Sequence, residues 1–315
     1  MTIRIGISSC LLGQKVRYDG GHKRDPFLVE TFGRHVEWVP VCPELEMGLG
    51  VPREPIHLVA AAGGGARLVG VKSGTDHTAA VQKYAKRRLD GLASLDLCGY
   101  VFKSDSPSCG LWRVKVWREA GQPARNGRGA FAAALVERFP HLPVEEEGRL
   151  SEARLRENFI ERVFAYARLK ALFAGRWTVG RLVAFHAAHK LLLLAHSPDA
   201  YRKLGRLVAG ASSADRRGIR ETYEDGFMSA LAVMATRGRH VNVLQHMAGY
   251  VREKLDPVSR DELYQMIADY RAGLVPLVVP ITLMRHHVRR LAVAYLSEQV
   301  YLDPHPQEMM LRNRV

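Results

Sequence analysis

Three cysteines each follow a short apolar segment of the sequence. Cys10 comes after RIGISS, Cys42 after VEWVPV, and Cys109 in the loop KSDSPSCG beyond LCGYVF. In an open α/β sheet the carboxyl ends of the strands border the crevice that binds ligands, so thiols on three such segments can converge there. Three thiolates suit an iron–sulfur cluster that keeps one iron open. The pattern therefore suggests chemistry at a soft metal centre.

Spacing alone leaves an alternative open, because free cysteine is among the most buried residue types and these thiols also suit an ordinary core. The chain has no CxxC pair, and three isolated cysteines are too few for a four-cysteine zinc site unless histidines join. Cys98, inside LDLCGYVF, is interpreted as a buried apolar residue and excluded. Prolines and glycines crowd the other three cysteines, and such residues form tight turns that aim side chains at one point.

The segments around the three cysteines resemble the thiouracil desulfidase (TudS) family. The motifs that carry the resemblance are CLLG followed by RYDGG, then PVCPE, then SPSCG, within residues 1–145. Members hold a [4Fe-4S] cluster on three cysteines and remove sulfur from thiolated pyrimidines, which implies that Cys10, Cys42 and Cys109 are cluster ligands. The second half, with FHAAHK, NVLQHMAGY and YLDPHPQEMMLRN, resembles YbgA-type proteins. The two halves together resemble RudS-type fused desulfidases, which act on 4-thiouridine in transfer RNA.

The reaction expected from this resemblance is hydrolysis of a carbon–sulfur bond without net electron transfer. A thiocarbonyl sulfur is a soft donor that suits an open iron, and its binding makes the adjacent carbon more electrophilic toward water. Glu44, two residues after Cys42, is the predicted base, with a first-turn helix acid as the alternative. Glu46 is interpreted as structural. Ser106 is the predicted hydroxyl donor to the reacting base, with turn capping as the alternative.

Three further residues near these motifs are predicted to bind substrate. Asp19 in RYDGG can hold a base edge or merely close a turn, and Lys103 can meet a phosphate or only solvent. Ser108 is interpreted as a structural or supporting residue beside the third cysteine.

Composition points to a two-domain protein with a polyanionic partner. The chain has 315 residues and a formal net charge of +14, of which residues 1–150 carry +5 and residues 151–315 carry +9. A basic balance of this size favours nucleic acid, although a solvated basic surface is the alternative. The sequence has no apolar run long enough to span a bilayer and no signal-peptide pattern, so we expect a cytoplasmic protein without membrane partners.

The periodicity predicts an α/β N-terminal domain with a Rossmann-like open sheet, residues 1–148, and an all-α C-terminal domain, residues 149–315. Ser151 is the expected N-cap of the first helix of the second domain. The expected elements of the first domain are strands at 3–9, 36–41 and 97–102, a hairpin through 56–72, an edge strand in WRVKVW, and helices near 25–33, 76–94 and in GRGAFAAALVERF. The expected helices of the second are 152–174, 178–195, 215–236, 239–254, 259–273 and 281–298, before an extended tail.

The helical domain is expected to bind the folded RNA. His186, His189 and His196 share one helical face, but no carboxylate or cysteine of matching spacing joins them, so we predict no metal site there. The densest basic stretch holds Arg202, Lys203, Arg206, Arg216, Arg217 and Arg220. We interpret Arg202, Arg206, Arg216 and Arg220 as phosphate contacts, with a solvated surface as the alternative.

Four functions compete at this point. The first is a desulfidase that converts 4-thiouridine in tRNA to uridine, and the second is a desulfidase of free thiouracil or thionucleosides whose helical domain serves assembly. The third is a non-catalytic, cluster-sensing nucleic-acid-binding protein, and the fourth is a DNA-binding accessory protein. Catalytic release of sulfide separates the first two functions from the others.

Overall fold

The computed structural model describes residues 2–118, 121–212, 215–309 and 311–313. The chain divides into two compact units, residues 1–152 and residues 153–315, where the sequence had suggested a boundary near residue 148. The first unit is α/β and the second is helical, which confirms the predicted fold class. Within the described ranges, none of the helices combines the length and apolar character that crossing a bilayer requires.

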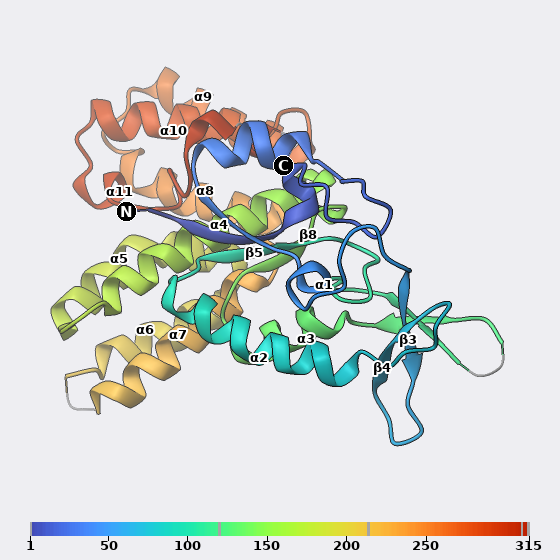
Figure 1. Ribbon diagram of the computed structural model, residues 1–315. Helices are drawn as coiled ribbons and strands as arrows, with labels where there is room; N and C mark the ends of the chain where they lie inside the picture. Colours follow the sequence, from blue (N-terminus) through green and yellow to red (C-terminus); the bar gives the residue numbers. More distant parts are fainter. Residues whose placement is uncertain (1, 119–120, 213–214, 310, 314–315) are drawn as a thin grey trace. The chain divides into compact units, whose positions relative to one another are not determined.

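A four-stranded parallel sheet forms the centre of the first unit (Figure 1). Its strands, in spatial order, are β2 (Glu37–Val41), β1 (Arg4–Ser8), β5 (Gly99–Phe102) and β8 (Val144–Glu146). All four residues of β5 are buried, as expected for a parallel strand covered on both faces. Ser8 is paired with Val41, and Ile7 with Val101, so β1, β2 and β5 end at one edge of the sheet. Cys10 and Cys42 follow directly at that edge.

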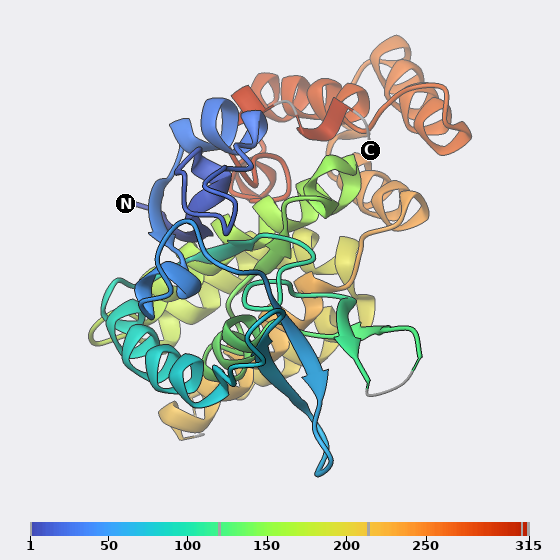
Figure 2. The same ribbon diagram turned by 45° about the vertical axis from the view of Figure 1, so that its right-hand side comes forward.

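A second four-stranded sheet carries the predicted hairpin (Figure 2). Its strands, in spatial order, are β4 (Ala66–Gly70), β3 (Ile56–Ala60), β6 (Val114–Trp117) and β7 (Ala124–Gly127). The prediction that WRVKVW forms an edge strand is wrong, because β6 pairs in parallel with β3 on one side and antiparallel with β7 on the other. The missed strand β7 has the sequence ARNG, which shows no apolar alternation.

Among its described residues, the first unit also contains the α-helices α1 (Pro43–Glu46), α2 (Thr78–Ser94) and α3 (Ala130–Arg138). Helices α2 and α3 pack against each other and contribute to the core through side chains such as Tyr84 and Phe131, whose ring centroids lie 5.8 Å apart. The helix predicted near 25–33 is instead a π-helical turn, Phe27–Thr31, followed by a 3-10 turn, Phe32–Arg34.

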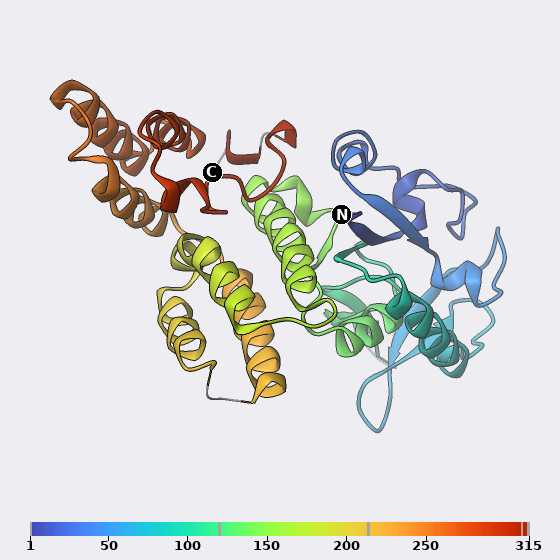
Figure 3. The ribbon, with the colours of Figure 1, turned by 90° about the vertical axis from the view of Figure 1, so that its left-hand side faces the viewer.

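The second unit consists of helices that pack around one apolar core (Figure 3). They are α4 (Ala153–Phe173), α5 (Val179–His196), α6 (Pro198–Ala209), α7 (Arg216–Ala232), α8 (Arg237–Val251), α9 (Pro257–Ala272), α10 (Val278–Arg290) and α11 (Ala294–Ser297). Helix α6 was not predicted. The single helix expected at 281–298 is divided, because Ala292 adopts a left-handed φ of 49° that ends α10.

The segment just before α4 and the C-terminal tail both contain short turns. Ser151, the expected N-cap of α4, lies in a 3-10 turn, Arg149–Ser151, just before that helix, and its hydroxyl donates to the Gly148 carbonyl at 2.6 Å. The tail expected to be extended forms compact turns, Gln307–Met309 and Leu311–Asn313, while Met310 lies outside the described residues. Arg312 in the last turn is 6% exposed and forms ion pairs with Glu157 at 3.2 Å and Glu161 at 3.5 Å. The tail is therefore part of the core.

Candidate active site of the first unit

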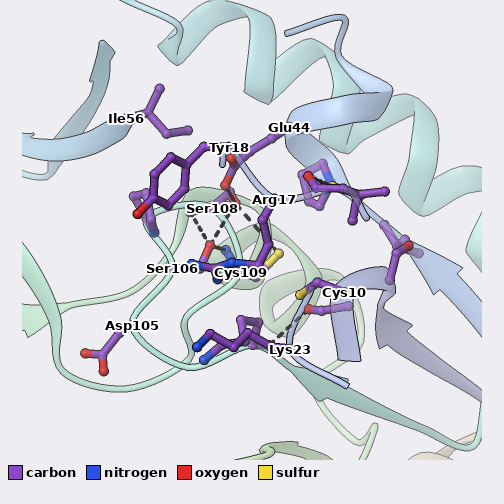
Figure 4. A pocket seen from close by; sticks show the side chains of 18 of the residues that line it. Cys10, Arg17, Tyr18, Lys23, Glu44, Ile56, Asp105, Ser106, Ser108 and Cys109 are labelled. Carbon is purple, nitrogen blue, oxygen red and sulfur yellow. Dashed lines mark hydrogen bonds between the residues drawn. The ribbon is translucent and has the colours of Figure 1, made fainter. Parts of the chain in front are cut away.

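The three predicted ligands line one cavity of about 370 Å³ at the carboxyl edge of the parallel sheet. Cys10 lies in a 3-10 turn, Ser9–Leu12, immediately after β1, and Cys42 lies between β2 and α1. Cys109 follows β5 in the SPSCG loop, and Figure 4 shows Cys10 and Cys109 in the same cavity. Cys98 is buried and is not among the residues that line the cavity. The structure thus brings together the three thiols that the sequence singled out.

The thiols lie in a poorly solvated environment. Burial raises the pKa of Cys10 to about 11 and also raises the pKa of Cys42 and of Cys109 above the usual thiol range. Cys42 is close enough to each of the other two thiols to raise the pKa of that thiol further by charge repulsion. Thiols of this kind lose their protons when a metal centre binds. The donor set and its seclusion fit an iron–sulfur cluster.

The described residues around the cavity do not form a site for a single metal ion. No group of three or more His, Cys, Asp or Glu side chains in the part of the chain that the structure describes forms such a site. In a cluster, each of the three cysteines would bind a different iron, which differs from three ligands around one ion.

Glu44 is held between a serine and an arginine at the rim of α1. Ser108 Oγ donates to Glu44 Oε1 at 2.6 Å, and Arg53 donates to Glu44 Oε2 from Nη2 at 2.6 Å and from Nε at 3.0 Å. The side chains of Arg53 and Glu44 are only 5% and 13% exposed. Glu44 therefore lines the cavity as a fixed carboxylate, with its position set by two partners.

Arg53 was missed by the sequence analysis because the segment VPREP carries no catalytic signature. The arginine also donates to the Val16 carbonyl at 3.0 Å and the Gly50 carbonyl at 2.8 Å, and its backbone N–H donates to the Tyr18 carbonyl at 2.9 Å. One buried guanidinium thus connects Glu44 with the loop that follows Cys10. The planar guanidinium can donate to several acceptors at once, which the compact ammonium of a lysine cannot do in the same geometry.

The two serines of the SPSCG loop have different surroundings. The hydroxyls of Ser106 and Ser108 lie 3.0 Å apart. Because Ser108 has one hydroxyl proton and gives it to Glu44, Ser106 must be the donor in this contact. Ser106 also accepts the Cys109 backbone N–H at 3.1 Å, so it caps the turn as well as lining the cavity. Ser108, interpreted as structural or supporting, is the serine in direct contact with Glu44.

The sequence of the first unit is similar to that of known proteins. The family model described as 2-thiouracil desulfurase matches residues 5–147. The chain is 32% identical over 134 residues to YbbK of Bacillus subtilis, covering 87% of that protein and 41% of this chain. This chain belongs to the 2-thiouracil desulfurase family. The [4Fe-4S]-dependent thiouracil desulfidase TudS is a solved structure with 31% identity, a TM-score of 0.40, and coverage of 48% of this chain and 94% of that one.

The second half of this desulfurase-family chain matches a different model. DUF1722, described as a protein of unknown function, matches residues 190–306. The chain is 33% identical over 161 residues to YbgA of Escherichia coli K12, covering 95% of that protein and 51% of this chain. Each of these two relatives thus corresponds to about half of the present chain. The resemblance to a fusion of the two families, expected from the motifs, is confirmed.

The structure also gives the contacts of the other residues singled out in the desulfurase domain. Glu46, interpreted as structural, accepts the Cys42 backbone N–H at 2.9 Å and the Tyr84 hydroxyl at 2.8 Å. Lys103 lines the cavity, but its ammonium is paired with Glu147 at 2.5 Å. Asp19 is not among the lining residues: its carboxylate accepts the Gly21 N–H at 3.0 Å, which closes the turn and lowers the pKa of Asp19. Its role in substrate binding stays a prediction.

The predicted RNA contacts lie on α6 and α7 of the DUF1722 domain. Arg202 is 4.0 Å from Asp199, and Arg220 is 3.0 Å from Glu224 and stacks over Phe173. Arg206 lies on α6 and Arg216 begins α7, and both are exposed. Part of this basic stretch is therefore compensated by neighbouring carboxylates.

The three histidines of α5 lie in the interior of the second unit. His186 is 3.1 Å from the Tyr223 hydroxyl, and His189 is 3.2 Å from Arg168. His196 is 2.5 Å from Glu161, a carboxylate contributed by α4. Spacing along one helix does not indicate this partner, because the pair joins α5 to α4.

Proposed function

We propose that this protein is a desulfidase that converts 4-thiouridine in tRNA to uridine, with a [4Fe-4S] cluster on Cys10, Cys42 and Cys109. The observation that carries the proposal is the placement of three thiols and one fixed carboxylate, Glu44, around a single cavity in a domain of the 2-thiouracil desulfurase family. The cavity volume of about 370 Å³ is in the range of small-molecule sites.

The overall reaction balances without an oxidant or a reductant. A carbon–sulfur double bond and one water give a carbon–oxygen double bond and one hydrogen sulfide. When bound, the cluster supplies a soft Lewis acid for the thiocarbonyl sulfur. All proton transfers then fall to side chains of the cavity.

Glu44 is the proposed acceptor of the proton from the attacking water. Arg53 fixes one oxygen of Glu44, and the other accepts a hydrogen bond from Ser108. Because Ser106 donates in turn to Ser108, the two hydroxyls form a short chain that ends on the carboxylate. Such a chain orients the base and stabilises its charge, and a positioned base of this kind contributes about a hundredfold or more to the rate.

The preference for tRNA over a free base is supported by the charge of the second half. Residues 151–315 carry a net charge of +9, and phosphate contacts provide affinity that a small base lacks. A thiolated base inside folded RNA must leave its stack to reach the cavity, at a cost of a few kcal/mol. Binding of distant phosphates by the helical domain offsets that cost.

The test uses anaerobically prepared protein with two substrates, thiolated tRNA and free 4-thiouracil, and measures released sulfide and loss of the near-ultraviolet absorption of the thiolated base. We expect sulfide from both, with a much higher kcat/KM for tRNA. A higher kcat/KM for the free base supports the second hypothesis, in which the helical domain serves assembly. Absence of sulfide from every thiolated pyrimidine contradicts the proposal.

A further inference from the structure

Tyr18 is a large aromatic side chain that lies at the cavity and stays open to solvent. Its side chain lines the same cavity as the three thiols and Glu44, yet the residue is 41% exposed. Figure 4 shows its ring on the side of the cavity where Ile56 lies. A single exposed aromatic residue is common on protein surfaces, so the exposure gains meaning only from how the ring is held.

The backbone around Tyr18 is fixed by the arginine that also fixes Glu44. The Arg53 N–H donates to the Tyr18 carbonyl at 2.9 Å, and the Arg53 guanidinium donates to the Val16 carbonyl at 3.0 Å. The same guanidinium lies 2.6 Å from Glu44. The position of the aromatic side chain is therefore tied to the position of the proposed base.

The chemistry around the ring suits a flat heterocycle. The Arg17 guanidinium lies 5.4 Å from the centroid of the Tyr18 ring, a cation–π arrangement that covers part of the ring. Val16 and Ile56 add apolar surface to the same cavity. A pyrimidine presents apolar faces and polar edges, so its face matches the ring while its edges remain free for the hydroxyls and the thiols.

We propose that Tyr18 is the surface on which the pyrimidine ring of the substrate stacks, and that this stack orients the base within the cavity. The inference rests on the proposed function, because it assigns a contact within the same site. Stacking uses the face of the base and not its sulfur. Uracil nucleotides without sulfur are therefore expected to bind at the same place, which allows the contact to be measured without turnover.

The experiment compares Tyr18→Leu, Tyr18→Phe and Tyr18→Trp in the full-length protein with its cluster in place. Calorimetry measures the Kd of uridine 5′-monophosphate, and steady-state kinetics measures KM and kcat for thiolated substrate. Tyr18→Leu is expected to weaken nucleotide binding and raise KM by roughly five- to a hundredfold, as loss of one stacked base contact does, with a smaller effect on kcat. The phenylalanine and tryptophan variants keep a ring and are expected to stay close to wild type.

The matched control is Tyr264→Leu, which removes a tyrosine of similar exposure, 38%, on helix α9. Iron content and thermal unfolding verify that each variant keeps its cluster and its fold. Unchanged nucleotide affinity and unchanged KM in an iron-replete Tyr18→Leu protein overturn the stacking proposal while leaving the desulfidase function standing. Absence of turnover on every thiolated pyrimidine, together with weakened nucleotide binding in Tyr18→Leu, rejects the function and retains the stacking site.

Discussion

Ser108 and Glu44 are 64 residues apart in the chain and meet at 2.6 Å beside the third cysteine. The contact links the SPSCG loop after β5 to the first turn of α1 after Cys42. Because Ser108 gives its hydroxyl proton to Glu44, Ser106 is the donor in the contact between the two serines. The sequence had singled out Ser106 as the hydroxyl that acts on the substrate, and that role of Ser106 stays a prediction.

The carboxylate and its serine are expected to act together in catalysis. Glu44→Gln should keep the iron and lose turnover by roughly a hundredfold or more, because the base that accepts the proton from water is removed. Ser108→Ala should also lower kcat, and the double variant should be little worse than Glu44→Gln, since the two groups form one unit. Steady-state kinetics on thiolated tRNA measures this, and near-normal activity of Glu44→Gln would assign the proton transfer to another group.

The three cavity thiols are expected to be necessary for iron binding. Serine in place of Cys10, Cys42 or Cys109 should remove the brown chromophore and most of the iron, because a hydroxyl is a poor ligand for soft iron. Cys98→Ser is the matched control, since Cys98 is buried but does not line the cavity. Iron analysis and visible absorption decide the matter, and full iron content in all three variants would rule out the ligand assignment.

Arg53 is expected to position Glu44 and not to take part in the reaction itself. Arg53→Met leaves a buried carboxylate without its partner, which should cost about 3 kcal/mol in the free energy of unfolding. Arg67→Met is the control, because Arg67 pairs with Asp76 at 3.4 Å on an exposed surface where such pairs contribute less than about 1 kcal/mol. Urea unfolding measures both, and an equally small loss in the two variants would mean that the Arg53 pair contributes little.

The stability of the second unit should depend on pH through the pair formed by Glu161 and His196. Burial opposes ionisation of both groups, but each charge favours the other, so the pKa of Glu161 is lowered and that of His196 is raised. The Glu161 contribution is lost as pH falls through its lowered pKa, and the His196 contribution is lost as pH rises through its raised pKa. The free energy of unfolding lost in Glu161→Gln should therefore be largest near pH 5 to 6. Denaturant unfolding followed by circular dichroism tests this, and a loss independent of pH would refute it.

The division of labour between the two units predicts how truncation and charge reversal act. A protein ending at Glu152, the end of the first compact unit, should keep some action on free thiopyrimidine and lose most action on tRNA. Glutamate in place of Arg206 or Arg216 should weaken tRNA binding and reduce its salt dependence by about one unit of slope per lost phosphate contact. Equal tRNA turnover by the truncated and complete proteins at physiological salt would show that the helical domain does not bind the RNA.

The parts of the fold that the sequence predicted well are those with strong local patterns. Strands β1, β2 and β5 are apolar runs that end in turn residues, and the long helices of the second unit repeat apolar residues every three or four positions. Strand β7 and helix α6 were missed. The segment ARNG has no alternation, and α6 begins directly after the end of α5, at Ser197 and Pro198, where the pattern indicated only a helix end.

The sequence predicted the residues of the candidate site that lie within recognisable motifs. The three cysteines and Glu44 lie beside Pro and Gly in recognisable segments, and the structure brings all four to one cavity. Arg53 and the contact of Ser108 with Glu44 depend on how the loops fold back on one another, which no local pattern records. The burial of Arg312 between Glu157 and Glu161 is a similar case, because it joins residues 151 or more positions apart.

The most direct test of the account is the fate of water during desulfuration. Anaerobically prepared protein is incubated with thiolated tRNA in ¹⁸O-labelled water, and the nucleosides and the released sulfide are quantified by mass spectrometry and by sulfide assay. We predict that each 4-thiouridine lost yields one sulfide and one uridine carrying one ¹⁸O, and that Cys42→Ser yields none. Unlabelled uridine, or loss of 4-thiouridine without sulfide, would contradict hydrolysis at this cavity.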